Sequence, residues 1–389
     1  MVAVRIRALR SSIAALVAWG LLLTGLSHAI TIRVPQDYAK IQVALQWATH
    51  GDVIVVSPGI YLENINFLGK NVVLRSTNPT SSAIVATTII DGNRQWSVVI
   101  FNGSETSSCT LSGFTIRNGA GDGGYGGGIY GGNAKARIEH NVITNNSAGS
   151  GYGAGGGGLY GCGGTIQNNV IANNSTSGGY GAGGGLYGCN GTIQNNVIAN
   201  NSASGVGRYG YGYGGGLYGC NGTIQNNIIT GNSASGDYGT GGGGLCYCGG
   251  TIRNNTIYGN LAWTEGGGLY KCSGVIVNCI IRGNTAPNGA QMCGSAVPSY
   301  SCIQGYTVGG QGNIGSDPRF RSLTDFHLQS RSPCIDAGTN LNCPAFDKDG
   351  RRRPMDGDGD GRAVVDMGAY EYPTVPRTAI RSLVWGLYR

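Results

Sequence analysis

Side chains able to perform acid–base chemistry are scarce in the middle of this 389-residue chain. Between residues 119 and 290 the carboxylates are Asp122, Glu139, Asp237 and Glu265. They do not recur at one repeat position. Glycoside hydrolysis needs two carboxylates at a set separation, and polysaccharide lyases need a base and often Ca²⁺ beside a uronate. One group close in sequence could supply a catalytic site: Asp122, Lys135, Arg137, Glu139 and His140. A salt-bridged surface turn is the alternative interpretation of that group.

An acidic turn near the C-terminus has the spacing of a calcium-binding loop. Oxygen ligands stand at loop positions 1, 3 and 5, and glycine at position 6, as at the start of an EF-hand loop: Asp356, Asp358, Asp360 and Gly361. Position 12 is Met367 instead of glutamate, and Asp366 at position 11 could substitute. We expect a structural Ca²⁺ held by these four aspartates, with Asp347 and Asp349 nearby in sequence. The alternative is a solvated acidic turn beside the arginines at 351–353.

Aromatic residues recur in two rows. The first row should face outward as a column, and its members are Tyr130, Tyr160, Tyr187, Tyr218 and Tyr270. The second row lies in the loops between repeats, at Tyr125, Tyr152, Tyr180, Tyr211, Tyr238 and Trp263. Aromatic faces suit sugar rings, so the first row is a candidate carbohydrate-binding surface. Alternatively, the tyrosines stack on one another and shield the sheet.

A repeat positions these rows. The phrase Gly-Leu-Tyr-x-Cys, followed by Gly-Thr-Ile-x-Asn-Asn, recurs between residues 129 and 285. Its leucine falls at Leu159, Leu186, Leu217, Leu245 and Leu269, with Ile129 as a first copy, at intervals of 30, 27, 31, 28 and 24 residues. This period, with short apolar runs, indicates a solenoid of strands. It is too short for a helix to return between strands, so coils should stack in parallel at ~4.8 Å.

Each repeat should bend at its asparagine pair. Ile166 and Ile171 are five residues apart, an odd spacing that one straight strand cannot place on a single face. Asparagine tolerates the left-handed conformation of such a corner, and its amide can bond to the asparagine above and below. We expect this of the row Asn141, Asn169, Asn196, Asn227 and Asn255, which Cys279 closes. A second row is Asn146, Asn174, Asn201, Asn232, Asn260 and Asn284.

The chain has 12 cysteines. Five form one column on the leucine face of the repeat: Cys162, Cys189, Cys220, Cys248 and Cys272. A buried thiol ladder is the favoured interpretation, although stacked neighbours would stand near disulfide distance. Outside the column, Cys334 with Cys343, and Cys293 with Cys302, could each bridge a loop.

The N-terminus has the features of a signal peptide over residues 1–29. A basic start is followed by an apolar segment at 13–26 and by Ser27 and Ala29 at the cleavage positions. Its removal takes three arginines, which leaves 23 basic against 19 acidic residues, a net charge of +4. That balance is too mild to argue for nucleic acid or an anionic membrane. We expect no membrane span in the mature chain, a secreted or cell-surface location, and a monomer.

The start of the mature chain resembles secreted bacterial right-handed parallel β-helix proteins of the pectin-lyase-like superfamily. The resemblance rests on an amphipathic helix at 37–49, with Asp37 as N-cap, followed by the run Gly-Asp-Val-Ile-Val-Val-Ser-Pro-Gly-Ile-Tyr at 51–61. Gly-Lys-Asn-Val-Val-Leu at 69–74 and Ile-Ile-Asp-Gly at 89–92 fit the same pattern. It implies a parallel β-helix over residues 30–305, with the helix covering the open end of the core.

Past residue 305 the repeat stops. Asp-Pro-Arg-Phe at 317, Asp-Phe-His-Leu at 325, Ser-Pro-Cys-Ile-Asp-Ala-Gly at 332 and Val-Asp-Met-Gly-Ala-Tyr-Glu-Tyr at 365 follow in order. Together they are similar to the C-terminal region of bacterial choice-of-anchor Q surface proteins. We therefore expect a capping region at 306–372 and a tail at 373–389.

The sequence favours a binding or structural surface, adhesin-like and directed towards polysaccharide or a cell-surface glycan, with no required cofactor. The Gly-Gly-x-Leu and Ile-x-x-Asn repeats are similar to those of bacterial β-helical adhesins. A polysaccharide lyase or glycoside hydrolase of the pectin-lyase-like superfamily is the alternative. An acidic cluster in one groove of the folded rod would favour that alternative, whereas a tyrosine-lined face without one would favour binding.

Overall fold

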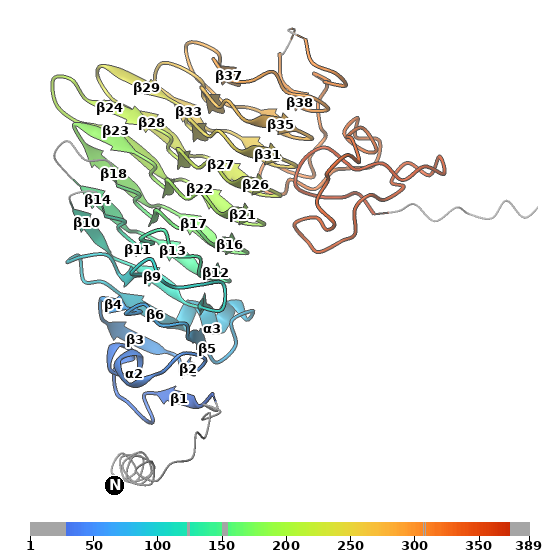
Figure 1. Ribbon diagram of the computed structural model, residues 1–389. Coiled ribbons are helices and arrows are strands. Elements are labelled where there is room, and N and C mark those ends of the chain that lie inside the picture. The colour runs from blue at the N-terminus through green and yellow to red at the C-terminus, as the bar shows by residue number, and fades with distance from the viewer. Residues whose placement is uncertain (1–28, 123–124, 150–154, 306, 308, 374–389) are drawn as a thin grey trace, which may run out of the picture.

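The strands of the chain wind as a right-handed parallel β-helix (Figure 1). The computed structural model describes residues 29–122, 125–149, 155–305, 307 and 309–373. Almost all of the expected signal peptide and tail, and also Tyr152, lie outside the described residues. No helix among the described residues is long and apolar enough to cross a membrane.

Five parallel sheets run along the axis of the stack. Sheet I contains β1 (Thr31–Val34), β2 (Val53–Val56), β5 (Val73–Ser76), β8 (Thr110–Ser112), β12 (Arg137–Glu139), β16 (Thr165–Gln167), β21 (Thr192–Gln194), β26 (Thr223–Gln225), β31 (Thr251–Arg253) and β35 (Val275–Val277). Sheet II contains β3 (Gly59–Leu62), β6 (Thr88–Asp91), β9 (Thr115–Arg117), β13 (Val142–Thr144), β17 (Val170–Ala172), β22 (Val197–Ala199), β27 (Ile228–Thr230), β32 (Thr256–Tyr258), β36 (Ile280–Arg282) and β38 (Cys302–Ile303).

The remaining sheets are shorter. Sheet III contains β10 (Ala120–Asp122), β14 (Ser147–Gly149), β18 (Ser175–Gly178), β23 (Ser202–Gly205), β28 (Ser233–Ser235) and β33 (Leu261–Ala262). Sheet IV contains β4 (Ile65–Asn66), β7 (Val99–Ile100), β11 (Ile129–Tyr130), β15 (Leu159–Tyr160), β20 (Leu186–Tyr187), β25 (Leu217–Tyr218), β30 (Leu245–Cys246), β34 (Leu269–Tyr270) and β37 (Met292–Cys293). Sheet V contains β19 (Tyr180–Ala182), β24 (Tyr211–Tyr213) and β29 (Gly239–Gly241).

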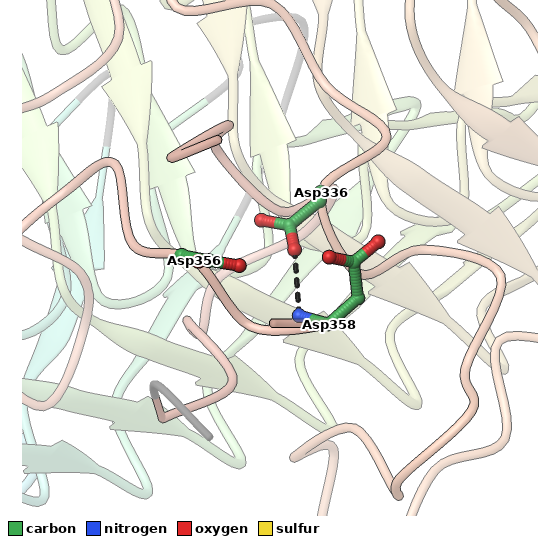
Figure 2. Close-up of side chains that lie close together, drawn as sticks. All are labelled: Asp336, Asp356 and Asp358. Carbon is green, nitrogen blue, oxygen red and sulfur yellow. Dashed lines mark hydrogen bonds between the residues drawn. The ribbon is translucent and has the colours of Figure 1, made fainter. Parts of the chain in front are cut away.

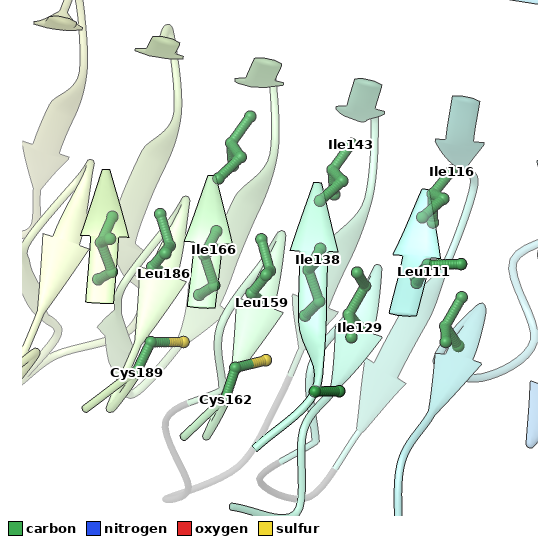
Figure 3. Close-up of a cluster of buried hydrophobic side chains, with 14 of the residues drawn as sticks. Leu111, Ile116, Ile129, Ile138, Ile143, Leu159, Cys162, Ile166, Leu186 and Cys189 are labelled. Atoms are coloured by element: carbon green, nitrogen blue, oxygen red, sulfur yellow. The ribbon is translucent and has the colours of Figure 1, made fainter. Parts of the chain in front are cut away.

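Equivalent apolar side chains line up inside the coil, as the repeat predicts. Ile166 pairs in register with Ile193, and Ile193 with Ile224. All three side chains are fully buried. Figure 3 shows how the isoleucines of sheets I and II and the leucines of sheet IV point into one shared interior. Burial of these columns, at ~25 cal/mol per Å² of apolar surface, is the main stabilising term of the stack.

The asparagine rows are buried ladders, but the left-handed residue stands one position earlier than expected. Asn196 donates from Nδ2 to Asn227 Oδ1 at 3.1 Å and to the Ile166 carbonyl at 2.9 Å. The preceding Asn195 takes the corner, with φ of 58°. The two asparagines therefore have separate roles, since the first makes the turn and the second satisfies buried backbone groups. Cys279 ends the row as expected, with Sγ donating to the Ile252 carbonyl at 3.6 Å.

The helix that covers the first coil is α2 (Ile41–Trp47), and Asp37 is not its N-cap. Lys40 holds that position without a side-chain bond. The carboxylate of Glu63 accepts from the amides of Ile41 and Gln42 instead, both at 2.9 Å. The capping group therefore comes from a carboxylate of the following coil and not from the residues just before the helix. A second helix, α3 (Ser82–Thr87), packs against β6 and β9.

Residues 309–373 form an irregular region that lies beside the second half of the stack, next to β26 and β31 (Figure 1). Phe326 packs with Ile228 of sheet II. Lys348 Nζ donates to the Asn195 carbonyl at 2.7 Å, and Asn254 Nδ2 donates to the Asp366 carbonyl at 3.2 Å. Most of the region thus covers sheet II and the asparagine corner beside it, which is a flank of the rod, while Ile314 pairs in parallel with Cys302 at the end of sheet II.

All 12 cysteines are free thiols in the structure. The five ladder cysteines are buried in the interior of the coil. Each ladder sulfur bonds to the carbonyl two residues before it, at 3.6–3.8 Å. This column is therefore a buried thiol ladder, in agreement with the favoured interpretation.

Candidate functional site

The structure does not bring the five residues of the expected acid–base group together on one sheet. Asp122 ends β10 in sheet III, whereas Arg137 and Glu139 lie in β12 of sheet I. Lys135 is exposed, and His140 occupies the corner after β12 with a left-handed φ of 57°. Arg137 Nη2 lies 2.8 Å from Glu139 Oε2. This pair has the geometry of the alternative, a salt-bridged surface turn.

Glu139 begins a row that the sequence analysis missed, here called the glutamine ladder: Glu139, Gln167, Gln194, Gln225 and Arg253. Each glutamine Nε2 donates to the oxygen on the preceding coil at 2.6–2.8 Å, and the Arg253 Nε donates to Gln225 Oε1 at 2.8 Å. A carboxylate only accepts and a guanidinium only donates, so the charged ends fix the direction of every amide. The recurring Thr-Ile-Gln tripeptide was the available signal.

The ladder also decides the protonation of Glu139. Burial raises the pKa of Glu139, but the hydrogen bonds from Arg137 and Gln167 outweigh burial and hold that pKa below its ordinary value. Glu139 is therefore an ionised end group that accepts hydrogen bonds. A general acid would need the opposite shift.

The first tyrosine row stacks on itself along sheet IV. Ring centroids of Tyr130 and Tyr160 lie 5.9 Å apart, and those of Tyr160 and Tyr187, and of Tyr187 and Tyr218, lie 5.1 Å apart with nearly parallel planes. These four side chains are half-buried, and Tyr270 is buried. Burial raises the pKa of Tyr160 and of Tyr187, so their phenols stay neutral. The row matches the self-stacking alternative, and it offers little ring face to a ligand.

The loop tyrosines cover part of this row through sheet V. Tyr180 and Tyr211 pair in register in β19 and β24. The Tyr180 hydroxyl lies 2.9 Å from the Tyr218 hydroxyl, at the edge of the first row. Gly214, with φ of 63°, returns the chain from sheet V to sheet IV, where a Cβ would stand 2.4 Å from the Leu217 carbonyl oxygen. The Gly-Tyr loops therefore form a second layer outside the coil.

The first row is interrupted at Cys246, which pairs between Tyr218 and Tyr270. Tyr213 of sheet V fills this gap by stacking on Tyr270, with centroids 6.2 Å apart and planes 4° apart. Tyr247, whose φ is 51°, lies edge-on to both Tyr218 and Tyr270 at 5.8 Å. At this interruption, aromatic rings from outside the row therefore pack against the tyrosines of sheet IV.

Beside this gap the surface is hollowed by a groove of 380 Å³, here called the aromatic groove: Tyr213, Tyr238, Gly239, Thr240, Trp263, Thr264, Glu265, Pro287 and Asn288. Tyr238 is 61% exposed and Trp263 56% exposed, and the Tyr238 ring also lies at steep angles against the rings of Tyr209 and Tyr211. Asn288 Nδ2 donates to Glu265 Oε1 at 3.1 Å. The groove contains one carboxylate and no basic side chain among its lining residues. Tyr238 and Trp263 belong to the loop row of aromatic residues, and not to the expected binding column.

Three carboxylates gather at the acidic turn, as Figure 2 shows: Asp336, Asp356 and Asp358, whose oxygens lie within 4.8 Å of one another. Asp336 Oδ2 accepts from the amides of Gly357 and Asp358 at 2.9 and 2.8 Å. Its buried Oδ1 has no hydrogen-bond partner. Burial, and then repulsion from Asp358 and Asp356, raises the pKa of Asp336. A hard cation with oxygen ligands would relieve this repulsion, so these residues fit Ca²⁺.

The cation group differs from the expected one at two positions. Asp360 accepts from the Arg362 amide at 2.7 Å and does not belong to the group. Asp366 is buried and accepts from the Asp336 amide at 2.8 Å, so its carboxylate is bound in another network. Asp336 takes the third place, and it comes from the Ser-Pro-Cys-Ile-Asp run, 20 residues before Asp356. Its contribution depends on tertiary folding, which the loop spacing could not show.

Asp366 belongs to a buried charge network with Glu371 and Arg353. Arg353 Nη1 lies 3.2 Å from Glu371 Oε1, and both side chains are fully buried. The Asp366 amide donates to Glu371 Oε1 at 3.0 Å. Burial, and then repulsion from Glu371, raises the pKa of Asp366 to about 8; burial raises the pKa of Glu371 to about 7. This network holds the C-terminal region together.

Comparison with known proteins adds a structural likeness. No protein-family model and no curated protein matches the sequence. Among solved structures, the crystal structure of pectate lyase Pel9A is similar over 89% of this chain and 97% of its own chain, with a TM-score of 0.47 and 14% sequence identity. The parallel β-helix described above follows from the strand pairing itself, and a likeness at this identity carries no information about chemistry.

Proposed function

We propose that this chain is a secreted or cell-surface binding protein whose aromatic groove holds carbohydrate. The observation that carries the proposal is the pair of exposed rings, Tyr238 and Trp263, beside hydrogen-bonding groups in one hollow. Sugars present an apolar face to aromatic rings and hydroxyls to polar side chains. The groove volume of 380 Å³ lies at the lower end of the range of ligand sites, which suits one or two sugar units.

The charge of the groove favours a neutral sugar. Glu265 is the charged group among the lining residues, and a uronate carboxylate placed beside it would be repelled. Glu265 already accepts from Asn288, so both side chains are held in position to bond to hydroxyl groups. The preferred ligand is therefore a neutral glycan, with an acidic polymer bound more weakly.

The same set of lining residues weighs against the alternative of a lyase or hydrolase. Hydrolysis by the usual mechanism needs two carboxylates flanking the bond, and the groove lining supplies Glu265. A uronate lyase needs cationic groups or a metal at the substrate carboxylate, and the lining supplies no basic residue. The proposal is therefore binding without cleavage.

A glycan array run beside a release assay on pectin-like polymers tests this proposal. We expect retention of neutral glycans without soluble fragments. Trp263→Ala should weaken binding roughly tenfold, since one aromatic stacking contact contributes about 1–2 kcal/mol. Trp96→Ala is the matched control, because Trp96 is 58% exposed and lies outside the groove. Depolymerisation of a uronate polymer would show that the chain is an enzyme instead.

For the acidic turn we propose a structural Ca²⁺ held by Asp336, Asp356 and Asp358. The mutual repulsion of three carboxylates and the orphaned Asp336 Oδ1 support it. Its role would be to join the segment at 332–338 to the turn at 356–361, and it takes no part in ligand binding at the groove.

A further inference from the structure

Two buried cysteines meet where the C-terminal region packs on the last coil. Cys302 lies in β38, where its amide donates to the Cys279 carbonyl of the previous coil at 2.8 Å. Cys334 lies in the C-terminal region, where its carbonyl accepts from the Met367 amide at 3.0 Å. Both are fully buried, and both belong to one apolar cluster with Ile280, Leu328 and Met367.

The chain between them holds the two cysteines at the same place. The thiol of Cys302 donates to the Ser316 carbonyl at 3.1 Å. Two residues further, the Pro318 carbonyl accepts from the Ser332 hydroxyl at 2.6 Å, and that hydroxyl in turn accepts from the Cys334 amide at 3.2 Å. The segment at 316–318 thus fixes Cys302 on one side and Cys334 on the other.

We propose that Cys302 and Cys334 form a disulfide that fastens the C-terminal region to the β-helix. This goes beyond the binding function, because it concerns how the C-terminal region stays attached to the β-helix. The bond would close a loop of about 30 residues, a length at which a cross-link restricts the unfolded chain substantially.

The exchange begins before the C-terminal region docks, because both sulfurs are fully buried in the docked structure. The Cys302 thiolate attacks a small-molecule disulfide such as oxidised glutathione, which forms a mixed disulfide and releases one thiol. The Cys334 thiolate then attacks the Cys302 sulfur, which forms the intramolecular bond and releases the second thiol. Two electrons and two protons pass to the external disulfide.

The cysteines of the thiol ladder do not form a defined disulfide pair that would compete with Cys302–Cys334. Its five members are stacked inside the coil, where each of the three inner members has two neighbours, and pairing always leaves one sulfur over. Cys302 and Cys334 come instead from two regions that meet only when the C-terminal region docks. Their sulfurs are therefore accessible to an oxidant until the docking step.

Peptide mapping of the full chain tests the bond. The protein is equilibrated with reduced and oxidised glutathione, and free thiols are then alkylated under denaturing conditions. Trypsin with chymotrypsin and an Asp-specific protease separates Cys293 from Cys302 at Tyr300, and Cys334 from Cys343 at Asp336. We expect one linked pair, Cys302 with Cys334, about 2 Da lighter than the two thiol peptides together, and alkylated ladder cysteines. Alkylation of both Cys302 and Cys334, or pairing of either with another cysteine, overturns the proposal.

Limited proteolysis gives the second readout. Reduction of the wild-type chain should raise the rate of cleavage after Arg319 and Arg331 roughly tenfold, because the untied region opens more often. In Cys302→Ser the reductant should have no effect on that rate, whereas Cys343→Ser, a matched control, should keep the wild-type response. If Cys302→Ser does not fold, the wild-type map decides alone. An equal rate with and without reductant in a mapped, linked sample would exclude a fastening role.

Discussion

The middle of the rod and its C-terminal flank satisfy their buried polar groups in opposite ways. Between residues 141 and 236, Arg208 is the only charged residue or histidine in the sequence. The buried polar side chains there are mainly neutral amides that repeat from coil to coil. The C-terminal region buries Asp347, Arg353, Asp366 and Glu371 instead.

The difference lies in what each region can use as a partner. In a solenoid, every coil meets a copy of itself, so an amide finds an amide at the same height and both donor and acceptor are satisfied. An irregular region has no copy of itself, and each buried carbonyl or amide needs a partner of its own. Charged groups provide strong bonds for this purpose, but they cost desolvation and they titrate. The two regions should therefore respond differently to mutation, pH and cations.

The largest effect should come from interrupting an asparagine ladder. Asn196→Ala removes the donors to the Ile166 carbonyl and Asn227 Oδ1, and it removes the acceptor of Asn169. The Ile166 carbonyl and the Asn169 amide each lose a buried bond, whereas Asn227 Oδ1 keeps the bond from the backbone amide of residue 196. We expect a loss of about 3–5 kcal/mol, seen as a lower urea midpoint.

Asn190→Ala is the control for that loss. Asn190 is exposed, and its side chain accepts one bond, from the Asn221 amide at 2.9 Å. Its removal should cost less than about 1 kcal/mol, because water can replace it. Equal losses for Asn196→Ala and Asn190→Ala would mean that the ladder does not depend on burial.

A smaller effect should separate the regions by pH. The folded pKa of Asp366 is raised to about 8 and that of Glu371 to about 7, both above their ordinary values. Protonated carboxyls therefore favour the folded state below pH ~4, and this contribution is lost as pH rises to ~8. We expect the C-terminal region to lose about 2–4 kcal/mol over this window, measured by proteolysis within 309–373.

The repeat region provides the internal control for this measurement. It has no carboxylate between residues 141 and 236, so its unfolding should be insensitive to the same change of pH. Lys348, whose pKa burial lowers to about 8, affects the C-terminal region mainly above that pH. Asp366→Asn should flatten the dependence, and an unchanged slope in that variant would assign the dependence to other groups.

The repeats explain why the fold was predictable and the groove was not. The columns that contain Ile166 and Asn196 were predictable because the repeat period is visible in the sequence and stacked coils place equivalent residues above each other. The aromatic groove is lined by Tyr213, which stacks on Tyr270 next to the position where Cys246 interrupts the tyrosine row. A break in the repeat is visible in the sequence, but which ring fills it depends on the packing of the loop layer.

The flank was less predictable for a related reason. Loop spacing predicts Asp356 and Asp358 as cation ligands, and both lie in the carboxylate cluster, but Asp336 reaches that cluster from a distant segment. The loop position of Asp366 predicts a place at the same turn, but its carboxylate accepts from the backbone amides of Asp336 and Tyr372 instead. In an irregular region the partner of a charge is set by tertiary folding, and sequence distance gives no guide to it.

Calcium should act on the flank alone. Binding of Ca²⁺ to Asp336, Asp356 and Asp358 should raise the free energy of unfolding of the C-terminal region by about 1–3 kcal/mol. Removal of the Ca²⁺ with a chelator should abolish that increase. The measurement is protease resistance within 309–373 with and without Ca²⁺. Asp358→Asn should lose the response, whereas Asp237→Asn, far from the turn in sequence, should keep it. A rise in resistance of the Asp358→Asn variant equal to the wild-type rise would reject the site.

The smallest effect should appear where the two regions join. Arg253 ends the glutamine ladder by donating to Gln225, and its guanidinium also bonds to the Asn342 carbonyl of the flank. Arg253→Gln keeps a donor for Gln225 but removes the charge and the bond to the flank, so we expect a loss of about 0.5–1.5 kcal/mol. Arg208 is an exposed arginine of the repeat region, and Arg208→Gln should change the free energy of unfolding by less than about 0.5 kcal/mol.

The ladder is neutral between its ends, so Arg253→Gln should mainly weaken the contact with the C-terminal region. Cleavage within 309–373 should accelerate, while the urea midpoint of the repeat region should stay unchanged. A lower urea midpoint of the repeat region itself would show that the charged end stabilises the whole row of glutamines. Charged groups would then stabilise the repeat region as well as the C-terminal region.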